Sequence, residues 1–123
     1  MKSFDLKFLT ITIEDFFCQV VFSDTKRKFD RPDADEHYIL FQYSEDESEE
    51  IDANYCYIES DDISIVGFYK KLDAKLFRDR LFLDLKKYGN IEINFEANER
   101  EFKNLKLTLE ALFSGLGKFK VFY

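Results

Sequence analysis

The residues with the greatest capacity for chemistry lie around the single histidine of the chain, His37. Asp30, Asp33, Asp35 and Glu36 precede it, so that carboxylates and an imidazole stand close together in sequence. Such a set could hold a hard cation or support acid–base catalysis. Its spacing, however, lacks the glycine-centred loop and terminal glutamate of an EF-hand. We therefore interpret it as a solvated connection and predict no catalytic and no metal-binding residue.

Other catalytic sets are also missing from the sequence. Cys18 and Cys56 stand among apolar and aromatic neighbours, are far apart in sequence, and match no zinc, redox or nucleophile signature. We expect two reduced, buried thiols. The four glycines are isolated from one another, at Gly67, Gly89, Gly115 and Gly117. A phosphate-binding glycine loop is therefore excluded, and we expect no cofactor.

The charge of the chain is negative and unevenly distributed. It contains 25 acidic and 18 basic residues, for a formal net charge of -7. Residues 14–64 hold sixteen acidic and four basic residues, whereas residues 65–123 hold twelve basic and eight acidic residues. This balance argues against nucleic acid and anionic membranes as partners, because both require a positive surface. An acidic surface would instead attract a basic protein.

An acidic run in the middle of the chain is the strongest candidate for such a surface. Mutual repulsion keeps its side chains in solvent, so we predict a loop there. We predict that this loop and an acidic pair shortly after it contact a protein partner; a role in solubility alone is the other interpretation. The predicted contact residues are Glu45, Asp46, Glu47, Glu49, Glu50, Asp52, Asp61 and Asp62.

The hydrophobic pattern indicates one α+β domain over residues 1–123. Apolar residues make up 46% of the chain, and alternation such as Leu81/Leu83/Leu85 predicts strands that short turns join into an antiparallel meander. The first strand is expected within residues 4–13. Near the C-terminus the period changes to that of an amphipathic helix, about residues 98–114, packed on a sheet face. Asn98 and Glu101 predict its capping box, and residues 118–123 form either an edge strand or a tail.

Several of these segments together resemble the Immunity protein ten family of bacterial polymorphic toxin systems. The resemblance covers roughly residues 37–114, with an Arg-Asp-Arg-Leu turn between alternating strands, an Ile-x-Ile-x-Phe strand and a Phe-x-x-Leu helix. The matching positions are residues 55–59, Gly67, residues 76–85, residues 91–95, Phe102, Leu105, Leu109 and Phe113. The resemblance implies a non-enzymatic protein that binds and neutralises a cognate toxin.

We therefore expect a cytoplasmic immunity protein that blocks a basic toxin by stoichiometric binding. The start of the chain shows no secretory signal, and no segment approaches the roughly 20 apolar residues that span a membrane. Two alternatives are a small hydrolytic or metal-dependent enzyme that uses His37 with nearby carboxylates, and an acidic interaction module unrelated to toxins.

Overall fold

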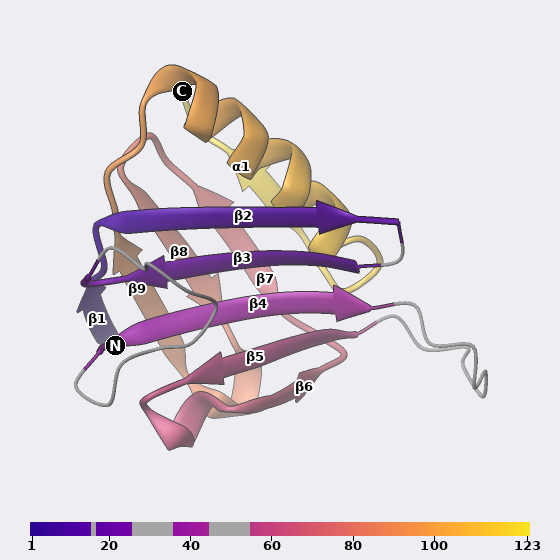
Figure 1. Ribbon diagram of the computed structural model, residues 1–123. Helices are drawn as coiled ribbons and strands as arrows, with labels where there is room; N and C mark the ends of the chain where they lie inside the picture. Colours follow the sequence, from indigo (N-terminus) through magenta and orange to yellow (C-terminus); the bar gives the residue numbers. More distant parts are fainter. Residues whose placement is uncertain (16, 26–35, 45–54) are drawn as a thin grey trace.

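The computed structural model describes residues 1–15, 17–25, 36–44 and 55–123. These residues form two five-stranded, mostly antiparallel sheets and one α-helix (Figure 1), which confirms the predicted α+β class. Sheet A contains β1 (Lys2–Asp5), β9 (Asn90–Asn94), β8 (Arg80–Asp84), β7 (Asp73–Leu76) and β10 (Phe119–Val121), in this spatial order. Sheet B contains β2 (Phe8–Glu14), β3 (Phe17–Ser23), β4 (Tyr38–Ser44), β5 (Cys56–Ser60) and β6 (Gly67–Tyr69).

The strand connections follow the predicted meander only within each sheet. Strands β2 to β6 pair antiparallel in chain order, and so do β7 to β9. Between β6 and β7, residues 70–72 carry the chain from sheet B to sheet A. The short polar break in the sequence at this point did not indicate a change of sheet. The predicted first strand is also divided, because β1 and β2 belong to different sheets. Residues 119–121 form an edge strand, and both β1 and β10 pair parallel with their neighbours.

The two sheets face each other across one core. Their strands run in crossing directions in Figure 1, an arrangement that lets two twisted sheets share side chains at their inner faces. Phe22 of β3 meets Phe95, just beyond β9, with ring centroids 5.2 Å apart. Phe22, Phe41, Leu81 and Ile93 are fully buried in this core. Leu81, Leu83 and Leu85, whose alternation predicts an inward face, are buried in this core.

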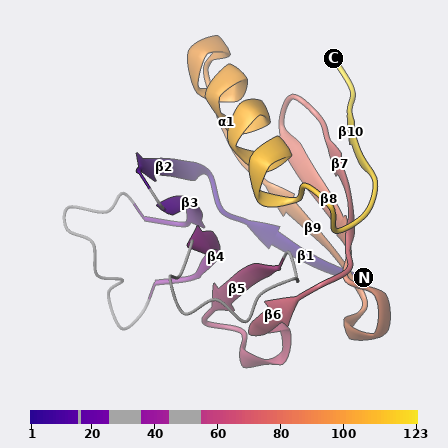
Figure 2. The same ribbon diagram turned by 90° about the vertical axis from the view of Figure 1, so that its right-hand side faces the viewer.

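The single α-helix among the described residues, α1 (Glu99–Leu112), closes the core on one side (Figure 2). Asn98 caps it as predicted: its Oδ1 accepts from the amide of Glu101 at 2.8 Å, and the Glu101 carboxylate accepts from the amide of Asn98 at 3.0 Å. The apolar stripe is buried against β2, β3 and β4. The helix has fourteen residues and lacks the length and apolarity of a membrane-spanning helix, and no other helix in the described ranges has them.

The turn after α1 contacts residues 70–72, the segment that connects sheet B to sheet A. The amide of Leu72 donates to the carbonyl of Leu116 at 3.3 Å. Gly117 lies so close that a Cβ on it would collide with the carbonyl oxygen of Leu72 and approach the Asp73 carboxylate. Only glycine allows the two backbones to meet in this way.

We therefore expect Gly117→Ala to lower the free energy of unfolding by about 1–3 kcal/mol, the usual cost of overpacking. Gly67→Ala is the matched control, because a Cβ at Gly67 meets nothing within 4 Å. It should leave stability unchanged or raise it by about 0.4–1 kcal/mol through the unfolded state. Urea unfolding of both variants measures the difference, and equal stabilities would contradict the proposed close contact.

Candidate functional site

Six of the eight predicted contact residues lie outside the described residues: Glu45, Asp46, Glu47, Glu49, Glu50 and Asp52. Asp61 and Asp62 are described, and both make specific contacts within the protein. Their segment connects β5 to the short 3-10 helix η1 (Ile63–Ile65).

Asp61 joins this segment to the start of β4. One carboxylate oxygen lies 2.7 Å from Nδ1 of His37, and the other accepts from the amide of Tyr38 at 2.9 Å. The hydrogen bond and charge of Asp61, with a smaller effect of Asp24, raise the pKa of His37. Burial raises the pKa of Asp61, but its hydrogen bonds from His37 and Tyr38 outweigh this effect and leave it lowered. The histidine considered for catalysis is thus part of a surface ion pair.

Asp62 caps η1 and holds the N-terminal strand. Its carboxylate accepts from the amide of Ser64 at 3.0 Å and lies 2.8 Å from Nζ of Lys2. The hydrogen bonds from Lys2 and Ser64 lower the pKa of Asp62 to about 2. Both described members of the predicted contact set therefore have structural partners of their own.

The predicted cluster around His37 is only partly described, because Asp30, Asp33 and Asp35 lie outside the described residues. The side chain of Glu36 is buried and accepts from the Thr25 hydroxyl at 3.3 Å, whereas that of His37 is exposed and turned to Asp61. In the described ranges, no three His, Cys, Asp or Glu side chains form a group that could hold a metal ion.

The two cysteines are free thiols, on β3 and β5. Cys56 is buried as predicted, and this burial raises its pKa to about 12. Cys18 is only partly buried, and its pKa is raised by the same effect. Neither environment favours a reactive thiolate.

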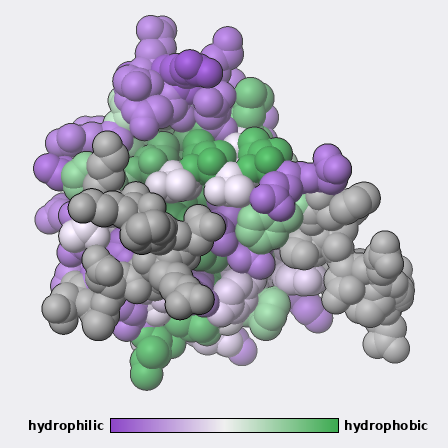
Figure 3. All heavy atoms as spheres, in the orientation of Figure 1, coloured by the Kyte–Doolittle hydropathy of each residue, from purple (hydrophilic) through white to green (hydrophobic). Residues whose placement is uncertain are grey.

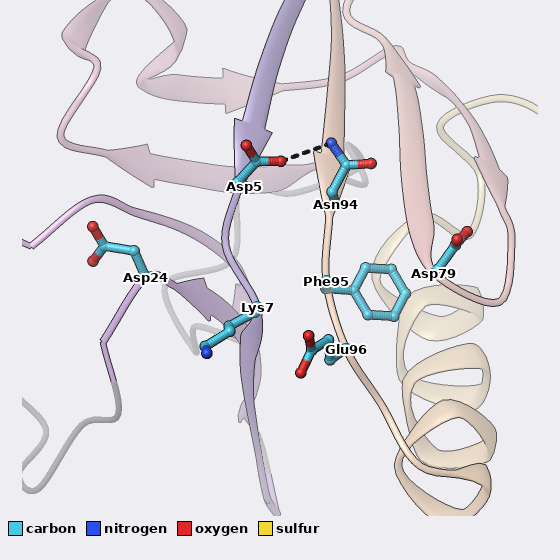
Figure 4. Close-up of a pocket in the computed structure, with 7 residues that line it drawn as sticks. All are labelled: Asp5, Lys7, Asp24, Asp79, Asn94, Phe95 and Glu96. Atoms are coloured by element: carbon cyan, nitrogen blue, oxygen red, sulfur yellow. Dashed lines mark hydrogen bonds between the residues drawn. The ribbon is translucent and has the colours of Figure 1, made fainter.

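The described surface contains a different acidic feature, a pocket of about 500 Å³ at the corner where β1 leads into β2. We call it the corner pocket. Its described lining residues come from four separate segments: Asp5, Lys7, Asp24, Asp79, Asn94, Phe95 and Glu96. With four carboxylates and one ammonium, this lining has a formal net charge of -3. Figure 4 shows Lys7 and Glu96 between Asp24 and Asp79.

Backbone hydrogen bonds fix the segments that form the corner pocket. The amide of Leu6 donates to the carbonyl of Asn94 at 2.9 Å, and the amide of Glu96 donates to the carbonyl of Lys7 at 3.1 Å. The amide of Phe95 donates to the carbonyl of Asp79 at 3.0 Å, which positions the turn between β7 and β8. The acidic side chains therefore project from a rigid part of the fold.

The charges of the corner pocket are not neutralised within the described part of the protein. None of its four carboxylates takes part in an ion pair there, and neither does Lys7. The Lys7 ammonium lies 5.1 Å from the centre of the Phe8 ring instead. Asp5 accepts a hydrogen bond from the Asn94 amide group at 3.1 Å, and Asp24 accepts one from the amide of His37 at 3.1 Å. Asp79 and Glu96 are exposed. The pocket is therefore suited to an organic cation, such as a lysine or arginine side chain.

No local sequence pattern groups these residues. Asp5, Asp24, Asp79 and Glu96 lie in four separate parts of the chain, and the parallel pairing of β1 with β9 brings the first and last of them together. A local pattern cannot report a strand pairing across almost 90 residues.

Comparison with known proteins adds no relative to this chain. No family model, no curated protein and no solved structure matches it.

The single histidine permits a direct test of the pair with Asp61. We expect Asp61→Asn to lower the pKa of His37 towards the ordinary value of about 6.5, because it removes the carboxylate that favours the protonated ring. Because the pKa of His37 is raised in the folded state, the His37–Asp61 pair stabilises the fold fully below about pH 6.5. This stabilisation is lost as the pH rises through the folded-state pKa of His37. NMR titration of the imidazole measures the shift.

Asp62→Asn is the matched control for this titration. It removes a neighbouring carboxylate that is paired with Lys2, so the pKa of His37 should stay near that of the parent protein. An equal decrease in both variants would show that general surface charge, and not the specific pair, sets the pKa.

Proposed function

We propose that this protein is a non-catalytic immunity protein that neutralises a basic bacterial toxin by stoichiometric binding. The observation that carries the proposal is the convergence on the corner pocket of four carboxylates that have no ion-pair partner among the described residues. The resemblance of the chain to the Immunity protein ten family supports a toxin as the partner.

The corner pocket would receive a lysine or arginine side chain of the toxin. Its Asp79 and Glu96 carboxylates could approach such a group from the β7–β8 turn and from the segment after β9. A guanidinium can donate hydrogen bonds to several carboxylates at once, because it carries five N–H donors in a planar arrangement. The Phe95 ring, which is buried between these two acidic groups, limits how deep the cation enters.

The charge of the whole chain supports the same kind of partner. A net charge of -7 accelerates encounter with a basic protein. The predicted acidic run, residues 45–52, would contribute to this long-range attraction whatever its conformation, because steering depends on charge more than on fixed contacts.

The direct test is co-expression with the toxin encoded by the neighbouring gene. We expect the protein to restore growth and to co-purify with the toxin in a fixed ratio. A toxin that remains lethal and unbound in the presence of the folded protein would refute the proposed function.

The pocket is tested by the double variant Asp79→Asn, Glu96→Gln. Neither side chain makes a hydrogen bond or ion pair in the described structure, so the fold should be retained. We expect binding to the toxin to weaken about tenfold, or about 1.4 kcal/mol. Calorimetric titration measures the change.

Glu14→Gln, Glu110→Gln is the matched control, because it removes two exposed charges away from the pocket. Its affinity should remain close to that of the parent protein. Equal weakening in both double variants would show that net charge, and not the corner pocket, determines affinity.

The acidic run is expected to affect the rate of association. Replacing Glu45, Asp46, Glu47, Glu49 and Glu50 by glutamine should slow association most at low salt, because exposed charges are screened at high salt. Stopped-flow measurements over a salt series test this expectation. An association rate that is unchanged at low salt would exclude the run from recognition.

A further inference from the structure

Strand β6 is the outer strand of sheet B on the side remote from β2. Its three residues pair with β5, and no backbone hydrogen bond joins them to any other described segment. An edge strand of this kind presents backbone donors and acceptors to a further strand. The edge is short, so side chains beside it must contribute to any binding.

Exposed apolar side chains gather around this edge. Ile63 is 85% exposed, Phe68 is 68% exposed and Tyr88 is 52% exposed. The Phe68 ring packs against Tyr57 with centroids 4.9 Å apart, and Tyr88, in the short helix η2 (Lys86–Tyr88), packs against Tyr69 at 5.2 Å. Apolar atoms are visible at the lower edge of Figure 3, where η1 lies in Figure 1. Aromatic rings are thus fixed next to both Phe68 and Tyr69 of the edge strand.

The charged groups beside this apolar edge are mainly lysines. Lys70 and Lys71 follow β6 directly, and Lys87 extends over the Tyr88 ring, with 5.2 Å between its ammonium and the ring centre. All three are exposed, and none forms an ion pair within the described residues. The nearby Lys86, in contrast, is paired with Asp73 and Asp84. An incoming strand would therefore meet three ammonium groups that have no ion-pair partner among the described residues.

We propose that the β6 edge binds an extended acidic segment of a partner protein as an additional strand of sheet B. Backbone hydrogen bonds to β6 would supply its alignment, Phe68 and Tyr88 would contact its apolar side chains, and the three lysines would select its acidic ones. This inference goes beyond toxin binding at the corner pocket. Asp79 of that pocket precedes β8 and Lys87 follows it, so the two surfaces lie at opposite ends of this strand.

The test uses the full chain and end-blocked octapeptides of alternating glutamate and valine. We expect this acidic peptide to shift the NMR signals of the Gly67, Phe68 and Tyr69 amides and to slow their hydrogen exchange. A peptide of alternating lysine and valine should bind more weakly, because it repels the lysines. A peptide of alternating glutamate and proline should also bind more weakly, because half of its backbone donors are missing.

Replacing Lys70, Lys71 and Lys87 by glutamine should weaken binding of the acidic peptide about tenfold, the order expected for three exposed charge contacts. The control replaces Lys75, Lys103 and Lys120, which are also exposed and without ion pairs in the described residues, and should retain the parent affinity.

The proposal would be overturned by equal binding of all three peptides, by shifts at the corner pocket in place of β6, or by equal weakening in both lysine variants. Concentration-dependent shifts of the β6 amides without peptide would also overturn it, because they would identify a second copy of the chain as the occupant. Loss of toxin binding in the variant of the corner pocket tests only the proposed function and does not test binding at the β6 edge.

Discussion

The fold depends on the corner at which the chain leaves sheet A and enters sheet B. Phe4 of β1 lies opposite Ile93 of β9, and four residues later the chain has become the first strand of the other sheet. Leu6, at the corner itself, is 2% exposed and joins the common core. Because its amide is bonded to the Asn94 carbonyl, the corner cannot move without breaking β9 pairing and core packing together. The acidic pocket on its outer side has the same rigidity.

The parts of the fold that local patterns determine were predictable. Alternation in Leu81/Leu83/Leu85 and the stripe with Leu105 and Leu109 place these side chains in the core, and the Asn98 capping box begins the helix as expected. The division into two sheets was not predictable, because Lys70 and Lys71 look like any other short polar break. The parallel edges β1 and β10 are set by distant partners, and no local rule identifies these partners.

The uneven charge of the chain has a counterpart in three dimensions. Sheet B comes wholly from residues 8–69, which include the whole acidic segment, residues 14–64, and four of the five strands of sheet A come from the more basic C-terminal part. The corner pocket nevertheless draws Asp24 from the first part and Asp79 and Glu96 from the second. Net charge per segment therefore indicated an acidic protein correctly but did not locate where unpaired carboxylates meet. Asp61 and Asp62, selected because they are acidic, instead bond to His37 and Lys2.

Acidic residues therefore have two different roles in this small domain. Asp61, Asp62 and Asp73 each face a cation and lock two segments together, so their charge is compensated inside the protein. Asp79 and Glu96 have no such partner in the described structure, so their charge is not compensated there. A cation supplied by another molecule would compensate it from outside, as Lys2 compensates Asp62 within the protein.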